Sequence, residues 1–134
     1  MAGRILITED DGDQHVIITD FLKSRGYETV AVPNGEEVLE RLAVGRFDLL
    51  ILDLAMPKVD GWTVLRQLRA QPETQGIPVI VLTAHAFAHD REKAFQAGCN
   101  EFIAKPFDPY ELLQSVQQLL GTQASGPASD SYAV

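Results

Sequence analysis

Hydrophobic residues along the chain fall into two kinds of short pattern, and the two kinds alternate. Continuous or strictly alternating apolar runs predict strands, whereas apolar residues that recur every three or four positions predict amphipathic helices. Gly, Pro, Asn and Asp stand between the runs and mark turns and helix ends. In the first predicted helix, for example, Ile17, Phe21 and Leu22 are expected to share a buried face. The pattern as a whole predicts five strands, each followed by a helix.

The predicted elements cover most of the chain. Strands are predicted over residues 5–8, 28–32, 49–53, 78–84 and 101–105, and helices over about residues 13–25, 35–44, 61–70, 88–97 and 109–120. Two helix starts carry specific signals. Asn34 with Glu37 predicts a capped start for the second helix, and Asp108 before Pro109 predicts the start of the last.

The alternation of strands and helices predicts an α/β fold. The runs at residues 49–52 and 79–82 are wholly apolar, as expected for strands that are covered on both faces of a parallel sheet. Right-handed crossovers then place helices on both faces, and five strands suit the flavodoxin-like order 2-1-3-4-5. We expect one folded domain over residues 1–121. Residues 122–134 are rich in Ser, Ala and Gly and are expected to form a flexible tail.

The stretch from Leu49 to Gly61 is the one around which the rest is organised. Its apolar run stops at Asp53, which places a carboxylate at the carboxyl end of a central strand. Ligands bind at that edge of open α/β sheets. From this stretch alone, a plain turn-capping role for Asp53 is as good an interpretation as a binding role.

Polar side chains lie at the carboxyl ends of four of the five predicted strands. They are Glu9, Asp10 and Asp11 after the first strand, Asp53 after the third, Thr83 on the fourth and Lys105 on the fifth. Carboxylates gathered at one edge repel one another unless a cation lies between them, and oxygen ligands without His or Cys select a hard ion such as Mg²⁺. A hydroxyl and an ammonium nearby suit phosphoryl oxygens. Together these groups indicate phosphoryl transfer to an aspartate.

The composition fits a small acidic domain. The chain has 134 residues and a net charge of −8, which argues against binding to nucleic acid or to anionic membranes. No apolar run is long enough to span a bilayer and no secretory signal precedes the first strand, so we expect a cytoplasmic protein. The single cysteine, Cys99, excludes an internal disulfide and is expected to be a packing residue, as is Trp62.

From about Arg4 to Gly121, the sequence resembles the receiver domain of two-component response regulators, with the chemotaxis response regulators as single-domain examples. Four motifs carry the resemblance, in the order and spacing of that family: ILITEDD, LLILDLAMPKVDG, PVIVLTAHA and FIAKPF. Each motif is weak alone, and the four together are highly specific.

The resemblance implies a role for each residue at the predicted edge. Asp53 would accept a phosphoryl group from a phosphohistidine. Mg²⁺ would be bound by Asp10, Asp53 and the backbone carbonyl of Ala55, with Glu9 acting through a water. Lys105 would pair first with Asp53 and then with its phosphoryl oxygens, and the peptide bond that follows Lys105 would be cis.

The resemblance also implies a switch. Thr83 would move towards the phosphoryl group, and Phe102 would turn inward to fill the space that Thr83 leaves. The surface of the fourth helix, fifth strand and fifth helix would then change shape for a downstream protein target. The phosphoryl donor would be a sensor histidine kinase or a histidine phosphotransfer protein. We expect a complete stand-alone regulator, a monomer or weak homodimer, and not an enzyme beyond its own phosphorylation and dephosphorylation.

Three other functions fit the sequence less well. A phosphohydrolase with an aspartyl-phosphate intermediate typically has a second Asp two residues after the nucleophile, where this chain has Ala55. A flavin or nucleotide binder needs a phosphate-binding loop after the first strand, and none is present. A degenerate receiver that only binds partners would not need the complete acidic set.

Overall fold

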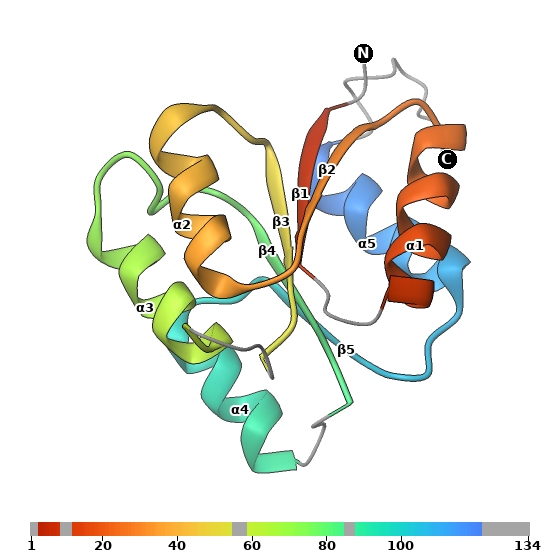
Figure 1. Ribbon diagram of the computed structural model, residues 1–134. Helices are drawn as coiled ribbons and strands as arrows, with labels where there is room; N and C mark the ends of the chain where they lie inside the picture. Colours follow the sequence, from red (N-terminus) through yellow and green to blue (C-terminus); the bar gives the residue numbers. More distant parts are fainter. Residues whose placement is uncertain (1–2, 9–11, 55–58, 85–87, 122–134) are drawn as a thin grey trace.

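A computed structural model describes residues 3–8, 12–54, 59–84 and 88–121, with the backbone alone for residues 12–16. The predicted tail at residues 122–134 lies outside the described residues, as does Asp11. Figure 1 draws these uncertain segments as a thin grey trace.

The described chain contains the strands and helices that the sequence predicts, in the same order. The strands are β1 (Arg4–Thr8), β2 (Glu28–Val32), β3 (Leu49–Leu52), β4 (Val79–Thr83) and β5 (Glu101–Ala104). The helices are α1 (Gly12–Ser24), α2 (Gly35–Val44), α3 (Gly61–Ala70), α4 (Ala88–Ala97) and α5 (Pro109–Leu120). Most boundaries lie within a residue or two of the predicted ones.

All neighbouring strands of the sheet are parallel, and their order is β2-β1-β3-β4-β5. The predicted flavodoxin-like fold is therefore confirmed. Because the strands are parallel, their carboxyl ends meet at one edge of the sheet, the lower edge in Figure 1. The strand order places β3 in the centre, so Asp53, which follows it, lies in the middle of that edge.

Helices cover both faces of the sheet. Figure 1 shows α1 and α5 on one face and α2, α3 and α4 on the other. Each face buries its own apolar cluster: one contains Ile18 and Leu22 of α1 with Leu112 of α5, and the other contains Val38 of α2 and Leu65 of α3. The central strand β3 is buried along its whole length because its side chains enter both clusters.

The predicted helix starts are confirmed in atomic detail. The side chain of Asn34 accepts a hydrogen bond from the backbone N–H of Glu37 at 2.9 Å, and Asp108 accepts one from the N–H of Tyr110 at 2.9 Å. Asp60 caps α3 in the same way, through the N–H of Thr63. Each cap satisfies a backbone donor that has no partner within its helix.

One packing prediction was wrong. Ile17, expected on the buried face of α1, is 57% exposed, whereas Ile18 is only 2% exposed. Leu22 is fully buried as predicted, and Ile18 shares its face because residues four apart lie on the same side of a helix.

Among the described residues, no helix has the length and apolar character needed to cross a membrane.

Candidate functional site

Asp53 is a buried carboxylate at the carboxyl edge of the sheet. It directly follows β3 and is 5% exposed, although the residues before it are apolar and belong to the core. A charged group is rarely buried to this extent unless it is paired. The position and the burial together favour a functional interpretation over simple turn capping.

Lys105 is the partner of this carboxylate. Its Nζ donates a hydrogen bond to Oδ2 of Asp53 at 3.1 Å, and the two side chains are only 13% and 7% exposed. The residues are 52 positions apart in the sequence and are brought together by the sheet. The peptide bond between Lys105 and Pro106 is cis. An ion pair so shielded from water is strongly coupled, because removal of either charge leaves the other buried and unpaired.

Thr83 ends β4, the strand between β3 and β5, and is completely buried. Its backbone carbonyl accepts a hydrogen bond from the N–H of Lys105 at 2.9 Å, which extends the pairing of β4 with β5 up to the site. Three of the predicted site residues, Asp53, Thr83 and Lys105, therefore come from three adjacent strands at one edge of the sheet.

One residue at this edge was not predicted from the sequence. Thr8, the last residue of β1, is 2% exposed, and its hydroxyl accepts a hydrogen bond from the backbone N–H of Asp53 at 3.0 Å. The same hydroxyl donates to the carbonyl of Ile51 at 3.3 Å. The available signal was a hydroxyl residue that ends an otherwise apolar strand next to the acidic residues.

The predicted metal site falls only partly within the described residues. Glu9, Asp10 and Ala55 lie outside them. Asp53 is thus the one predicted ligand whose side chain is described, and the described residues contain no group of three or more His, Cys, Asp or Glu side chains that could hold a metal. A buried carboxylate next to the end of β1, after which three more acidic residues follow in the sequence, fits a hard cation such as Mg²⁺.

Phe102, the predicted switch residue on β5, is 7% exposed and packs in the cluster under α3 and α4. Arg91 of α4 lies over it, with the guanidinium carbon 6.0 Å from the centre of the ring. Arg91 also donates a hydrogen bond to the carbonyl of Phe102 at 3.3 Å. The aromatic side chain is therefore held between α4 and β5, directly beside the strand that ends in Thr83.

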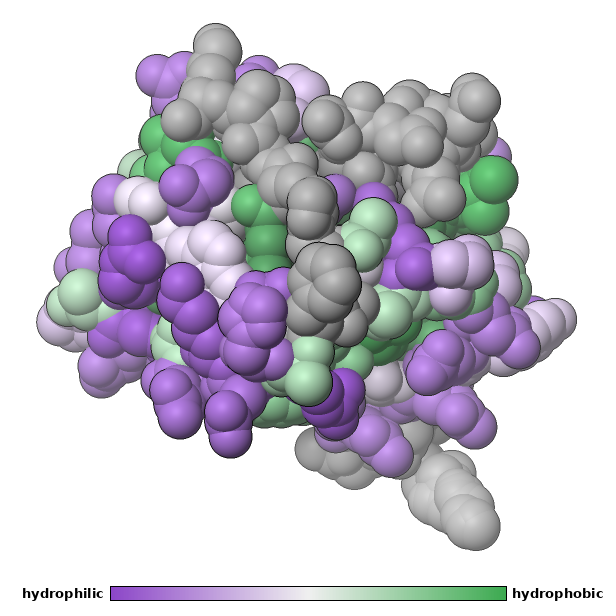
Figure 2. Space-filling view, turned by 90° about the horizontal axis from the view of Figure 1, so that it is seen from below, coloured by the Kyte–Doolittle hydropathy of each residue, from purple (hydrophilic) through white to green (hydrophobic). Residues whose placement is uncertain are grey.

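The described residues at the carboxyl edge present a mostly polar surface (Figure 2). Figure 2 looks onto this edge, where hydrophilic residues cover most of the described surface and hydrophobic residues show only in small separate areas. The described part of this surface shows no large apolar patch of the kind that would suit a hydrophobic ligand (Figure 2).

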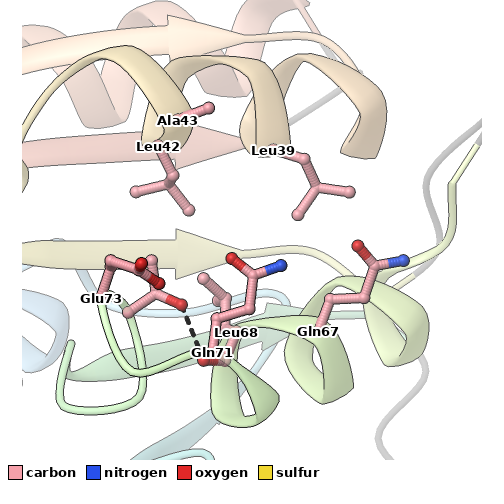
Figure 3. Close-up of a pocket in the computed structure, with 8 residues that line it drawn as sticks. Leu39, Leu42, Ala43, Gln67, Leu68, Gln71 and Glu73 are labelled. Carbon is pink, nitrogen blue, oxygen red and sulfur yellow. Dashed lines mark hydrogen bonds between the residues drawn. The ribbon is translucent and has the colours of Figure 1, made fainter.

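A surface hollow of about 350 Å³ lies elsewhere, between the carboxyl-terminal halves of α2 and α3. Figure 3 shows Leu39 and Leu42 of α2 facing Gln67 and Leu68 of α3 across it. Because both helices run antiparallel to the strands, this hollow is at the end of the molecule away from Asp53. Its lining contains none of the predicted site residues.

Comparison with known proteins agrees with this geometry. Residues 5–117 match the family described as the response regulator receiver domain. The polar-differentiation response regulator DivK of Brucella anthropi is 33% identical over 90% of this chain and 98% of its own length. A 14.6 kDa protein from the sodA1 3′ region of Leptolyngbya boryana is 37% identical over 85% of this chain and 87% of its own.

A solved structure gives the same result in three dimensions. The receiver domain of a sensor histidine kinase from Pseudomonas aeruginosa, solved with a magnesium ion coordinated in its active-site cleft, superposes with a TM-score of 0.82. It is 35% identical to this chain, and the match covers 89% of this chain and 98% of that one. On its sequence match and its fold, this chain belongs to the response regulator receiver domain family.

Proposed function

We propose that this protein is a phosphorylation-controlled signalling domain whose phosphoryl acceptor is Asp53. The observation that carries the proposal is the buried ion pair of Asp53 with Lys105 at the carboxyl edge of the sheet, in a chain of the receiver family. Receiver domains receive phosphoryl groups from sensor kinases. For this chain the donor is proposed to be a phosphohistidine on a sensor histidine kinase or on a histidine phosphotransfer protein.

The chemistry assigned to the site is a simple displacement at phosphorus. An Oδ atom of Asp53 forms a bond to phosphorus while the P–N bond of the phosphohistidine breaks, and the electron pair of that bond stays on the imidazole. The ammonium of Lys105, already 3.1 Å from Asp53, shifts its hydrogen bond to a phosphoryl oxygen, and the hydroxyl of Thr83 contributes another.

Mg²⁺ is the proposed cofactor, with Asp10, Asp53 and the carbonyl of Ala55 as ligands and Glu9 acting through a water. When bound, it would neutralise the charge that gathers on the carboxylates and the phosphoryl oxygens. Its proposed ligands are all oxygen atoms, as this ion prefers.

The output is proposed to be a change in the surface formed by α4, β5 and α5. Phe102 is the central residue because it is on β5, the strand paired with β4, and lies under Arg91 of α4. A shift of Thr83 towards the phosphoryl group would change the packing of Phe102 and hence the contact between α4 and β5. A downstream protein would read that change, so the domain signals by binding and not by turning over a substrate.

Intact-mass measurement after incubation with Mg²⁺ and a small acyl phosphate tests the proposal. We expect one added phosphoryl group, lost in Asp53→Asn and in EDTA. Asp20→Asn, which changes an exposed carboxylate on α1, is the matched control and should be labelled like the wild type. Labelling that persists in Asp53→Asn would move the acceptor elsewhere, and a wild-type protein that never gains the group would overturn the proposal.

A further inference from the structure

Thr8 is a buried polar residue at the end of an apolar strand. The residues before it in β1, Ile5, Leu6 and Ile7, are fully buried and belong to the core, and Thr8 itself is 2% exposed. A valine would fit the same backbone and the same space without a polar atom to satisfy. The buried hydroxyl therefore needs hydrogen-bond partners.

Those contacts are with the segment that carries Asp53. The backbone pairing of β1 with β3 ends at Ile7 and Ile51. Beyond this pair, the side chain of Thr8 makes the hydrogen bonds between the two segments. Its hydroxyl accepts from the N–H of Asp53 at 3.0 Å and donates to the carbonyl of Ile51 at 3.3 Å. One side chain thus fixes two backbone groups on either side of Leu52, and both bonds are buried.

Hydrogen bonding of this kind is not automatic for threonines in this sheet. Thr29 lies on the neighbouring strand β2, and its buried hydroxyl has no hydrogen-bond partner among the described residues. The bonds of Thr8 are therefore specific to its place beside Asp53. An aspartate side chain has only two rotatable bonds, so the orientation of its backbone largely decides where its carboxylate points.

We propose that Thr8 is a positioning residue for the acceptor carboxylate, an inference that rests on the proposed function of Asp53. By holding the N–H of Asp53, its hydroxyl fixes the backbone from which the carboxylate reaches Lys105. The same residue directly precedes Glu9 and Asp10 in the sequence, the two residues proposed above to take part in Mg²⁺ binding. Without the hydroxyl, the N–H of Asp53 would lose this buried hydrogen bond, and the backbone at Asp53 would no longer be held in its present orientation.

The test is the rate of phosphorylation by acetyl phosphate at saturating Mg²⁺, followed by intact mass. In this reaction the Asp53 Oδ–P bond forms as the P–O bond to acetate breaks, and acetate leaves with the electron pair. Thr8→Val keeps the shape and removes the hydroxyl, and we expect its rate to fall by about 10-fold or more, as for a misplaced reacting group. Thr8→Ser keeps the hydroxyl and should stay within about 2-fold of the wild type.

Two controls separate positioning from a general loss of stability. Thr29→Val removes a buried hydroxyl without a partner, and Ile5→Val weakens the same strand at its far end; both should react at the wild-type rate. Thr8→Cys, with a weaker hydrogen-bonding group, should react at an intermediate rate and replaces Thr8→Val if that variant does not fold.

The outcomes are distinct. A wild-type rate in Thr8→Val or in Thr8→Cys would overturn the positioning role and leave Asp53 as acceptor. An equal loss of rate in Ile5→Val would also overturn it, because the loss would then reflect stability alone. A wild-type protein that is not labelled at all would overturn the proposed function and this inference together.

Discussion

The thiol of Cys99 lies in a turn between α4 and β5 and is 6% exposed. Burial raises its pKa from 9.0 to about 11, and the negative charge of Glu101 adds to the rise, while Arg69 and Arg91 oppose it. The thiol is therefore protonated at neutral pH and a poor nucleophile, because the thiolate is the reactive form. This agrees with the packing role that the sequence predicts for Cys99.

The raised pKa predicts a pH dependence of stability. Between about pH 9 and 11 the unfolded chain loses the thiol proton while the folded chain keeps it. The stabilisation is full below pH 9 and is lost as the pH rises through the folded value. We expect the free energy of unfolding of the wild type to fall across this range more steeply than that of Cys99→Ala, by at most about 1.4 kcal/mol per pH unit.

Urea denaturation of both proteins at a series of pH values measures that difference. Burial also raises the pKa of Tyr27, and the effect on stability has the same sign, but it is common to both proteins and cancels in the comparison. Parallel curves for the wild type and Cys99→Ala would show that the folded protein does not hold the thiol proton.

At the scale of elements, the start of α3 is packed directly against the end of β3. The N–H of Gly61 donates to the carbonyl of Leu54 at 3.1 Å. A Cβ atom at Gly61 would lie 2.6 Å from the carbonyl oxygen of Asp53 and 2.6 Å from Cα of Leu54. Only glycine permits this approach, so the start of α3 is held close against Asp53 and Leu54.

Gly61→Ala should therefore push α3 away from the acceptor. We expect the free energy of unfolding to fall by about 1–3 kcal/mol, the usual cost of overpacking, and phosphorylation of Asp53 to slow. Gly76→Ala is the matched control, since a Cβ there meets nothing within 4 Å and should change stability by less than about 0.5 kcal/mol. Urea denaturation followed by circular dichroism distinguishes the two, and equal midpoints would contradict the close approach.

The elements themselves were readily predicted from the sequence, because each strand and helix repeats its own hydrophobic period and carries turn residues at its ends. The failure at Ile17 has a local cause. Two adjacent isoleucines on a helix point in different directions, and Ile18 is the buried one because it lies one turn before Leu22 and packs in the same cluster. The site, too, was predicted only in part. Strand order alone brings Asp53 and Lys105 to one edge, but the hydroxyl contact of Thr8 depends on where the backbone pairing stops.

Considered as a whole, the molecule holds its helices in unequal ways. Helices α1, α2, α3 and α5 bury apolar side chains, whereas the buried set of α4 is Ala94 alone. Contacts of cationic side chains hold α4 in place of apolar burial. Lys93 lies over the ring of Trp62 at 4.6 Å, Arg91 lies over Phe102, and Arg69 of α3 donates twice to the carbonyl of Gly98, just after α4.

A helix held in this way can shift at low cost, since cation–π contacts at exposed sites contribute only about 0.5–1 kcal/mol each. Helix α4 also follows β4, the strand that ends in the buried Thr83 at the site. In this domain α4 is thus the element best suited to respond to phosphorylation of Asp53, and its contact with Trp62 makes the response measurable.

Trp62 is the single tryptophan of the chain, so its fluorescence reports on α4 without any label. We expect Mg²⁺ and acetyl phosphate to change its emission in the wild type and to have no effect in Asp53→Asn. Lys93→Gln should reduce the change, because it removes the ammonium that lies over the ring of Trp62. Intact mass should show that this variant is still phosphorylated. Lys105→Ala should be phosphorylated in part without the change, since it lacks the ammonium that pairs with Asp53 and is proposed to couple the phosphoryl group to β5. An emission change of wild-type size in Lys105→Ala would show that α4 responds by a route that does not pass through the ion pair.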